Sequence, residues 1–155
     1  MSGLLARLLP VRPGNEFPGN RVALWAFYGL TALTLWRSLH HILAPDGGAQ
    51  SVATIPLDQY DPAAAATVIA MFALWGLSQL LTALVMLLAC VRYKSLIPLL
   101  WLLVLAEYAG RWLVLHAKPI VTIGTAPGVI GNQVLPFVAL IMLILSLRPP
   151  SHGGS

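Results

Sequence analysis

Charged side chains are scarce in this sequence. Only 9% of its 155 residues are Asp, Glu, Lys or Arg, whereas 58% are hydrophobic. A soluble domain normally carries about 25% charged residues, because its surface has to be hydrated. Most of the surface of this chain is therefore expected to face lipid, and its length suits a single domain.

The sequence also lacks the short motifs of common enzymes and metal sites. Cys90 is the only cysteine, so no disulfide can form within the chain. There is no Gly-x-Ser-x-Gly nucleophile motif, no paired-cysteine motif and no His-Glu-x-x-His motif. We therefore expect a non-enzymatic protein and predict no cofactor.

A basic stripe is missing as well. The net charge is +4, but the nine Lys and Arg residues are scattered along the chain. Proteins that bind nucleic acid gather such residues on one face of the fold. The sequence therefore excludes nucleic acid as a partner.

What the sequence does contain is long apolar segments. A helix needs about 20 mainly apolar residues to cross a hydrocarbon core of about 30 Å. Four segments reach this length, and Asp61 followed by Pro62 is a typical helix start. The sequence predicts an all-α fold, a four-helix transmembrane bundle over 22–148, with spans at 22–43, 62–90, 96–117 and 132–147.

The cations outside these spans predict the orientation. Cytoplasmic loops of membrane proteins carry an excess of Lys and Arg. If the chain has four spans, six of these cations lie on one side of the membrane and only Lys118 lies on the other. We therefore expect a multi-pass membrane protein with both termini in the cytoplasm. The six cations are Arg7, Arg12, Arg21, Arg92, Lys94 and Arg148.

Two terminal segments flank the predicted bundle. The cytoplasmic arm, 1–21, begins with a leucine-rich stretch before Pro10. This stretch is either a short helix at the membrane interface or a frayed basic arm. The tail, 149–155, is expected to be flexible.

The third span carries charged residues inside the membrane, where each costs free energy and needs a partner. Glu107 lies close to mid-span and Arg111 follows four residues later, a spacing that allows the two side chains to pair. Lys118 falls on nearly the same stripe at the outer interface. The sequence predicts an ion pair here at the membrane's outer half.

The first span carries a second polar group at similar depth. Arg37, His40 and His41 lie on one side of that helix, one to two turns inside the outer surface. Together with Glu107 and Arg111 they predict a polar patch in the extracytoplasmic half of the bundle. This patch either locks the helices together or forms a site for a ligand or for proton transfer.

Two further sites are possible in the same half. His40, His41 and His116 are weak candidates for binding a metal ion or haem, although adjacent histidines point about 100° apart on a helix of about 3.6 residues per turn. The glycine-rich segment 122–132, near Arg111, is either an anion pocket or an ordinary loop.

Three functions follow from these residues. We expect first an accessory subunit, or a binder of a small ligand or lipid at the outer patch. The alternatives are a membrane redox component that uses haem or quinone, and a small proton-coupled transporter centred on Glu107. Four helices are few for a monomeric transporter. The expected partners are therefore the lipid bilayer and either further copies of the chain or a larger membrane complex.

Several short segments resemble those of a protein family rather than random sequence. In size and topology the chain is similar to the DoxX-like group of small four-span bacterial membrane proteins. The resemblance implies a four-helix, multi-pass protein of the bacterial inner membrane and assigns no functional residue. The segments are 44–48 (APDGG), 55–58 (IPLD), 107–111 (EYAGR) and 124–128 (GTAPG).

Overall fold

The computed structural model describes residues 3–148, and every regular element within that range is a helix. The predicted all-α class is therefore confirmed. The tail that was expected to be flexible, 149–155, lies outside the described residues. The elements are α1 (Gly3–Leu8), α2 (Arg21–Leu43), η1 (Leu57–Gln59), α3 (Pro62–Arg92), η2 (Lys94–Leu96), α4 (Ile97–Ala117) and α5 (Pro127–Leu147).

Three of these helices are long and apolar enough to cross a membrane. They are α3, α5 and the continuous stretch of η2 and α4. α2 is also long, but Arg37, His40 and His41 make its final third more polar. The chain is thus a helical membrane protein with three clear candidate spans, and α2 differs from them by its polar end.

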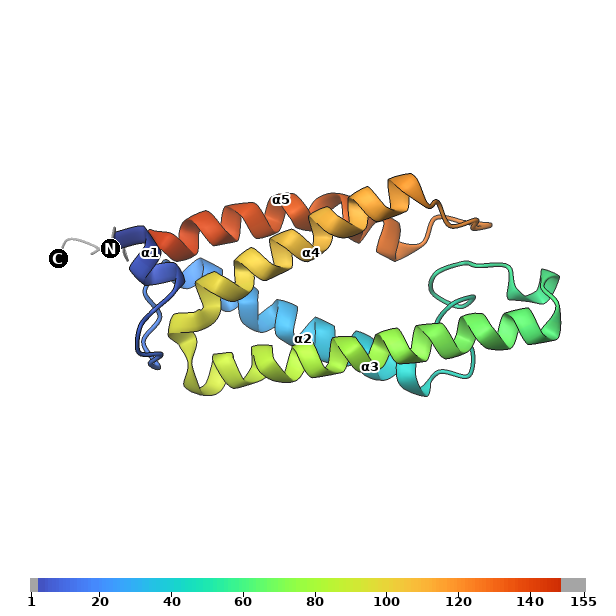
Figure 1. Ribbon diagram of the computed structural model, residues 1–155, viewed down its shortest axis with the longest axis horizontal. Helices are drawn as coiled ribbons and strands as arrows, with labels where there is room; N and C mark the ends of the chain where they lie inside the picture. Colours follow the sequence, from blue (N-terminus) through green and yellow to red (C-terminus); the bar gives the residue numbers. More distant parts are fainter. Residues whose placement is uncertain (1–2, 149–155) are drawn as a thin grey trace.

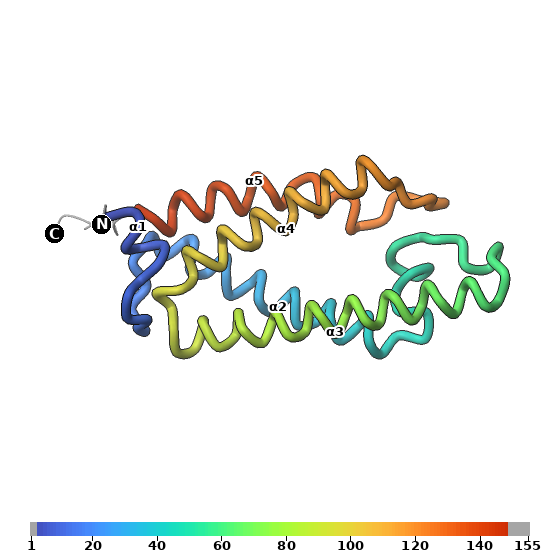
Figure 2. Tube along the Cα trace, in the orientation of Figure 1, coloured from blue at the N-terminus to red at the C-terminus, as the bar shows by residue number. Residues whose placement is uncertain are grey.

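The helices form two antiparallel hairpins, α2 with α3 and α4 with α5. Figure 1 shows the hairpins close together at the end where α1 lies and further apart at the opposite end. The tube in Figure 2 shows the loops 44–61 and 118–126 at this wider end. The polar residues of α2 and α4 lie toward the wider end.

Capping residues set the helix boundaries. The Asp61 carboxylate accepts a hydrogen bond from the Ala63 amide (2.9 Å), and Pro62 occupies the first turn, which confirms the predicted start of α3. α5 begins at Pro127, five residues before the expected start at Asn132. Pro127 stands where the helix needs no amide hydrogen bond, so the glycines after it continue the helix instead of forming a loop.

The N-terminal arm folds back on the helix ends. Its leucine-rich stretch is the helix α1, which was one of the two alternatives. Arg7 donates a hydrogen bond to the carbonyl of Leu147 (2.8 Å), at the end of α5. Gly14 and Ser95 exchange two hydrogen bonds, of 2.8 Å and 3.2 Å, beside the turn between α3 and α4. These contacts tie the arm to the end of the molecule where the hairpins meet.

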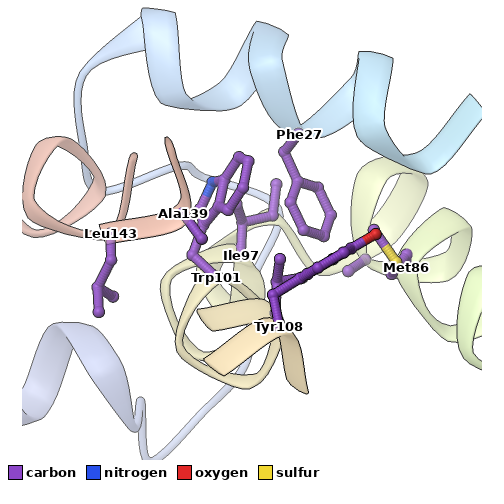
Figure 3. Close-up of a cluster of buried hydrophobic side chains, with 9 residues drawn as sticks. Phe27, Met86, Ile97, Trp101, Tyr108, Ala139 and Leu143 are labelled. Carbon is purple, nitrogen blue, oxygen red and sulfur yellow. The ribbon is translucent and has the colours of Figure 1, made fainter. Parts of the chain in front are cut away.

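The main hydrophobic core lies where the two hairpins meet (Figure 3). The rings of Phe27 and Trp101 meet edge to face, with centroids 5.4 Å apart. The Trp101 indole N–H donates to the carbonyl of Ala23 (3.2 Å), so its polar atom is satisfied although the side chain is buried. The core joins all four long helices and also contains Met86, Ala89, Ile97, Val104, Tyr108, Ala139 and Leu143.

Asp46 organises the loop that follows α2. Its carboxylate accepts hydrogen bonds from the amides of Gly48 (2.9 Å), Gln50 (3.1 Å) and Ser51 (2.6 Å). Partial burial raises the pKa of Asp46, but these hydrogen bonds outweigh it and lower the pKa to about 2. Gly47 and Gly48 have φ of 61° and 76°, a left-handed conformation that favours glycine. The loop is therefore held by an ionised carboxylate at neutral pH.

Candidate functional site

α2 and α3 approach each other closely at Gly76. A Cβ atom at this position would lie 2.7 Å from Cβ of His41 and 3.1 Å from the carbonyl oxygen of Ser38. Only glycine allows these backbones to come so near. The approach brings Arg37, on α2, beside Gln79, one turn further along α3.

Arg37 links three helices. Its Nε donates to Oε1 of Gln79 on α3 (3.1 Å), and one terminal nitrogen donates to the hydroxyl of Tyr108 on α4 (3.3 Å). Gln79 and Tyr108 are each only 5% exposed, so these hydrogen bonds lie inside the molecule. Both acceptors are neutral, and they leave the charge of the guanidinium uncompensated.

Glu107 and Arg111 form the predicted ion pair along α4. The Arg111 guanidinium also lies over the rings of Tyr108 (4.9 Å) and Trp75 (5.1 Å). The Arg37 guanidinium lies 5.9 Å from the same Trp75 ring. Cation–π contacts of this kind stabilise a guanidinium where water is scarce. The structure thus brings Arg37, Glu107 and Arg111 together around Trp75.

A cavity of about 240 Å³ lies between α2, α3 and α4, beside this group. Its polar part contains Arg37, Gln79, Glu107 and the Tyr108 hydroxyl, next to Trp75. The remaining lining residues extend toward the core, and most of them are apolar. They are Leu30, Thr34, Ser78, Thr82, Met86, Leu100, Leu103 and Val104.

His40 and His41 do not line this cavity. His41 is buried and its Nδ1–H donates to the carbonyl of Gly47 (2.7 Å), while its ring lies 4.9 Å from that of Trp75. His40 is half-buried and stacks on Trp36 (5.7 Å), and its Nε2 has no hydrogen-bond partner among the described residues. His41 therefore joins the loop after α2 to the aromatic residues of α3.

The other candidates on α4 lie apart from the cavity. His116 is exposed and stacks on Trp112 (5.4 Å). Lys118 is exposed at the end of α4 and forms no ion pair with another described residue. Within residues 3–148, no group of three or more His, Cys, Asp or Glu side chains is arranged to hold a metal ion. The structure does not bring His116 together with His40 and His41.

The segment 122–132 is joined to the other loop of the wide end. The Ile123 amide donates to the carbonyl of Thr54 (3.0 Å), and the Thr54 hydroxyl donates to the carbonyl of Gly124 (3.1 Å). The polar contacts of Arg111 are with its own helix and with α3. The last part of this segment, from Pro127 on, belongs to α5.

Three residues of the site were not predicted from the sequence: Trp75, Gln79 and Tyr108. A signal for Gln79 was present, because an amide inside an apolar span has to find hydrogen-bond partners. Trp75 and Tyr108 gave no comparable signal, since aromatic residues are common in membrane helices.

The fold and the cavity define a helical membrane protein with a polar group buried where its two hairpins separate. Compared with known proteins, the chain matches no family model, and no curated protein or solved structure is significantly similar to it.

Proposed function

We propose that the chain crosses the bacterial inner membrane four times, with α2 as the additional span and both termini in the cytoplasm. α2 has 23 residues, which corresponds to about 35 Å at about 1.5 Å per residue. It packs against α3, and α1 and the C-terminal end of α5 lie at the same end of the molecule (Figure 1). An even number of spans places both ends on one side. The cation asymmetry makes that side cytoplasmic.

Cysteine labelling tests this topology in variants that lack Cys90. A cysteine at Gln59 is expected to react with a membrane-impermeant maleimide in intact cells. A cysteine at Asn15 is expected to react only after the membrane is opened. Both residues are exposed, so a difference in labelling reports the side of the membrane. The reverse pattern would contradict the proposed orientation.

We propose further that the protein is a non-enzymatic binder of a single-chain amphiphile from the outer leaflet. The observation that carries this proposal is the polarity of the cavity, which is polar near Arg37 and apolar toward the core. A lipid of the outer leaflet has the same order of polarity across the membrane, with its polar headgroup outward and its apolar chain toward the middle of the bilayer. The cavity therefore matches such a molecule in both chemistry and orientation.

The size and the position of the cavity support the same ligand. Its volume of about 240 Å³ lies below the roughly 300–1,000 Å³ of pockets that enclose a drug-sized molecule. It would therefore hold one end of an amphiphile and leave the rest among the lipids. The exposed lining residues lie on α3 and α4, which places the opening between these helices. They are Trp75, Ser78, Thr82, Leu103 and Glu107.

A binding measurement with a filled cavity tests this function. Purified protein in a neutral detergent is titrated with tritiated oleate, oleyl phosphate and oleyl alcohol. At least one of them is expected to bind saturably at one site. Thr82→Phe should weaken that binding about tenfold or more, because the new ring occupies the cavity.

Thr67→Phe is the matched control for this variant. Thr67 and Thr82 are both exposed on α3, and each hydroxyl donates to the carbonyl four residues earlier. Only Thr82 lines the cavity, so Thr67→Phe should leave binding unchanged. If none of the three oleyl compounds binds saturably, the proposed function is wrong.

A further inference from the structure

The polar groups beside Arg37 in the cavity include unused hydrogen-bond donors. Gln79 is 5% exposed and its Oε1 accepts from Arg37, which leaves the Nε2 amide donors buried without a partner among the described residues. A guanidinium has five N–H groups and no acceptor. Arg37 uses two of its donors, on Gln79 and Tyr108. Since the Tyr108 oxygen accepts from Arg37, its own O–H is available to donate.

The charges around the cavity also favour an anionic ligand. Among the described residues, Glu107 is the only carboxylate that lines the cavity, and its partner is Arg111. Arg37 is thus left with neutral hydrogen-bond partners. The charges of Arg37, Glu107 and Arg111 sum to +1. A charge held away from water is costly unless an opposite charge compensates it. An anion beside Arg37 would supply this compensation and accept the free hydrogen bonds.

We propose that the amphiphile bound in the cavity carries an anionic oxygen headgroup, a carboxylate or a phosphate, that binds Arg37, Gln79 and Tyr108. This inference rests on the proposed function and specifies its ligand. The oxyanion accepts from the free N–H groups of Arg37, from Nε2 of Gln79 and from the Tyr108 hydroxyl. A cationic headgroup would leave these donors unpaired and would add a like charge.

The structure also explains why Glu107 does not repel such a headgroup. Its carboxylate is paired with Arg111, and that guanidinium is held in place by the rings of Trp75 and Tyr108. The negative charge at the opening of the cavity is therefore already neutralised. Arg37 remains the group that attracts an anion.

The experiment compares headgroups on one chain. For the full-length protein, oleate and oleyl phosphate are each expected to bind about 10- to 100-fold more tightly than oleyl alcohol, the usual range for hydrogen bonds to a charged group. Arg37→Gln should remove this difference, because the two anions lose their charged partner while the alcohol has no charge to lose. Arg92→Gln removes a cation at the other end of α3 and should keep the difference. Gln79→Leu should reduce the difference in affinity between the anions and the alcohol in part.

Each outcome separates this inference from the proposed function. If oleyl alcohol or a short-chain quinone binds as tightly as the anions, the headgroup inference is overturned while an amphiphile site remains. If inorganic phosphate or acetate displaces oleate at equal concentration, no chain is needed, and the inference is overturned as well. If no oleyl compound binds, the proposed function itself fails. The order of oleate and oleyl phosphate identifies the headgroup, and either order supports the inference. Because the wild-type comparison needs no variant, it decides the question even if Arg37→Gln does not fold.

Discussion

Replacing Trp101 with alanine is expected to lower the free energy of unfolding by about 3–5 kcal/mol, the usual cost of deleting a large aromatic side chain from a core. Trp101 is 2% exposed and packs against Phe27 where the two hairpins meet. Removing the ring leaves a cavity between them and deletes the hydrogen bond to Ala23. The hairpins should then separate more easily.

Unfolding by sodium dodecyl sulfate in mixed micelles, followed by far-UV circular dichroism, measures this loss. Trp25→Ala is the matched control, since Trp25 is 68% exposed and lies outside the core. Its replacement should change the free energy of unfolding much less. Equal losses in the two variants would contradict the assignment of Trp101 to the core.

Replacing Gly76 with leucine is the second change with a large expected effect. Even the Cβ atom would lie 2.7 Å from that of His41, so α3 has to move away from α2. Overpacking of this kind costs about 1–3 kcal/mol. The movement also separates Gln79 from Arg37, so binding of the oleyl anions should be lost together with part of the stability.

Gly110→Ala is the comparison for the substitution at Gly76. No atom lies within 4 Å of a Cβ built at Gly110, whereas Gly76 is surrounded. Alanine favours the helix over glycine by about 1 kcal/mol, so this variant should be as stable as the natural chain or more so. Unfolding in micelles and oleate binding are measured for both. A Gly76→Leu variant that keeps full stability and binding would show that α2 and α3 do not pack closely there.

Much of this architecture could be predicted from the sequence because it depends on local chemistry. The apolar runs predicted helices at nearly their observed positions, and the Asp61-Pro62 pair fixed the start of α3. The Glu107–Arg111 pair was predictable for the same reason, since both residues lie on one helix four positions apart. The start of α5 was placed too late because the glycines after Pro127 resemble a loop when read alone.

The sequence alone determined that this is an apolar, helical membrane protein whose charged residues within the spans gather in one half of its helices. Only the tertiary structure decided which of those charges share a site. Gly76 sets the distance between α2 and α3, and this distance brings Arg37 to Gln79 and on to Tyr108. The same packing directs His41 to the Gly47 carbonyl, away from the cavity. Contacts between helices depend on crossing geometry that residue spacing along one helix does not contain.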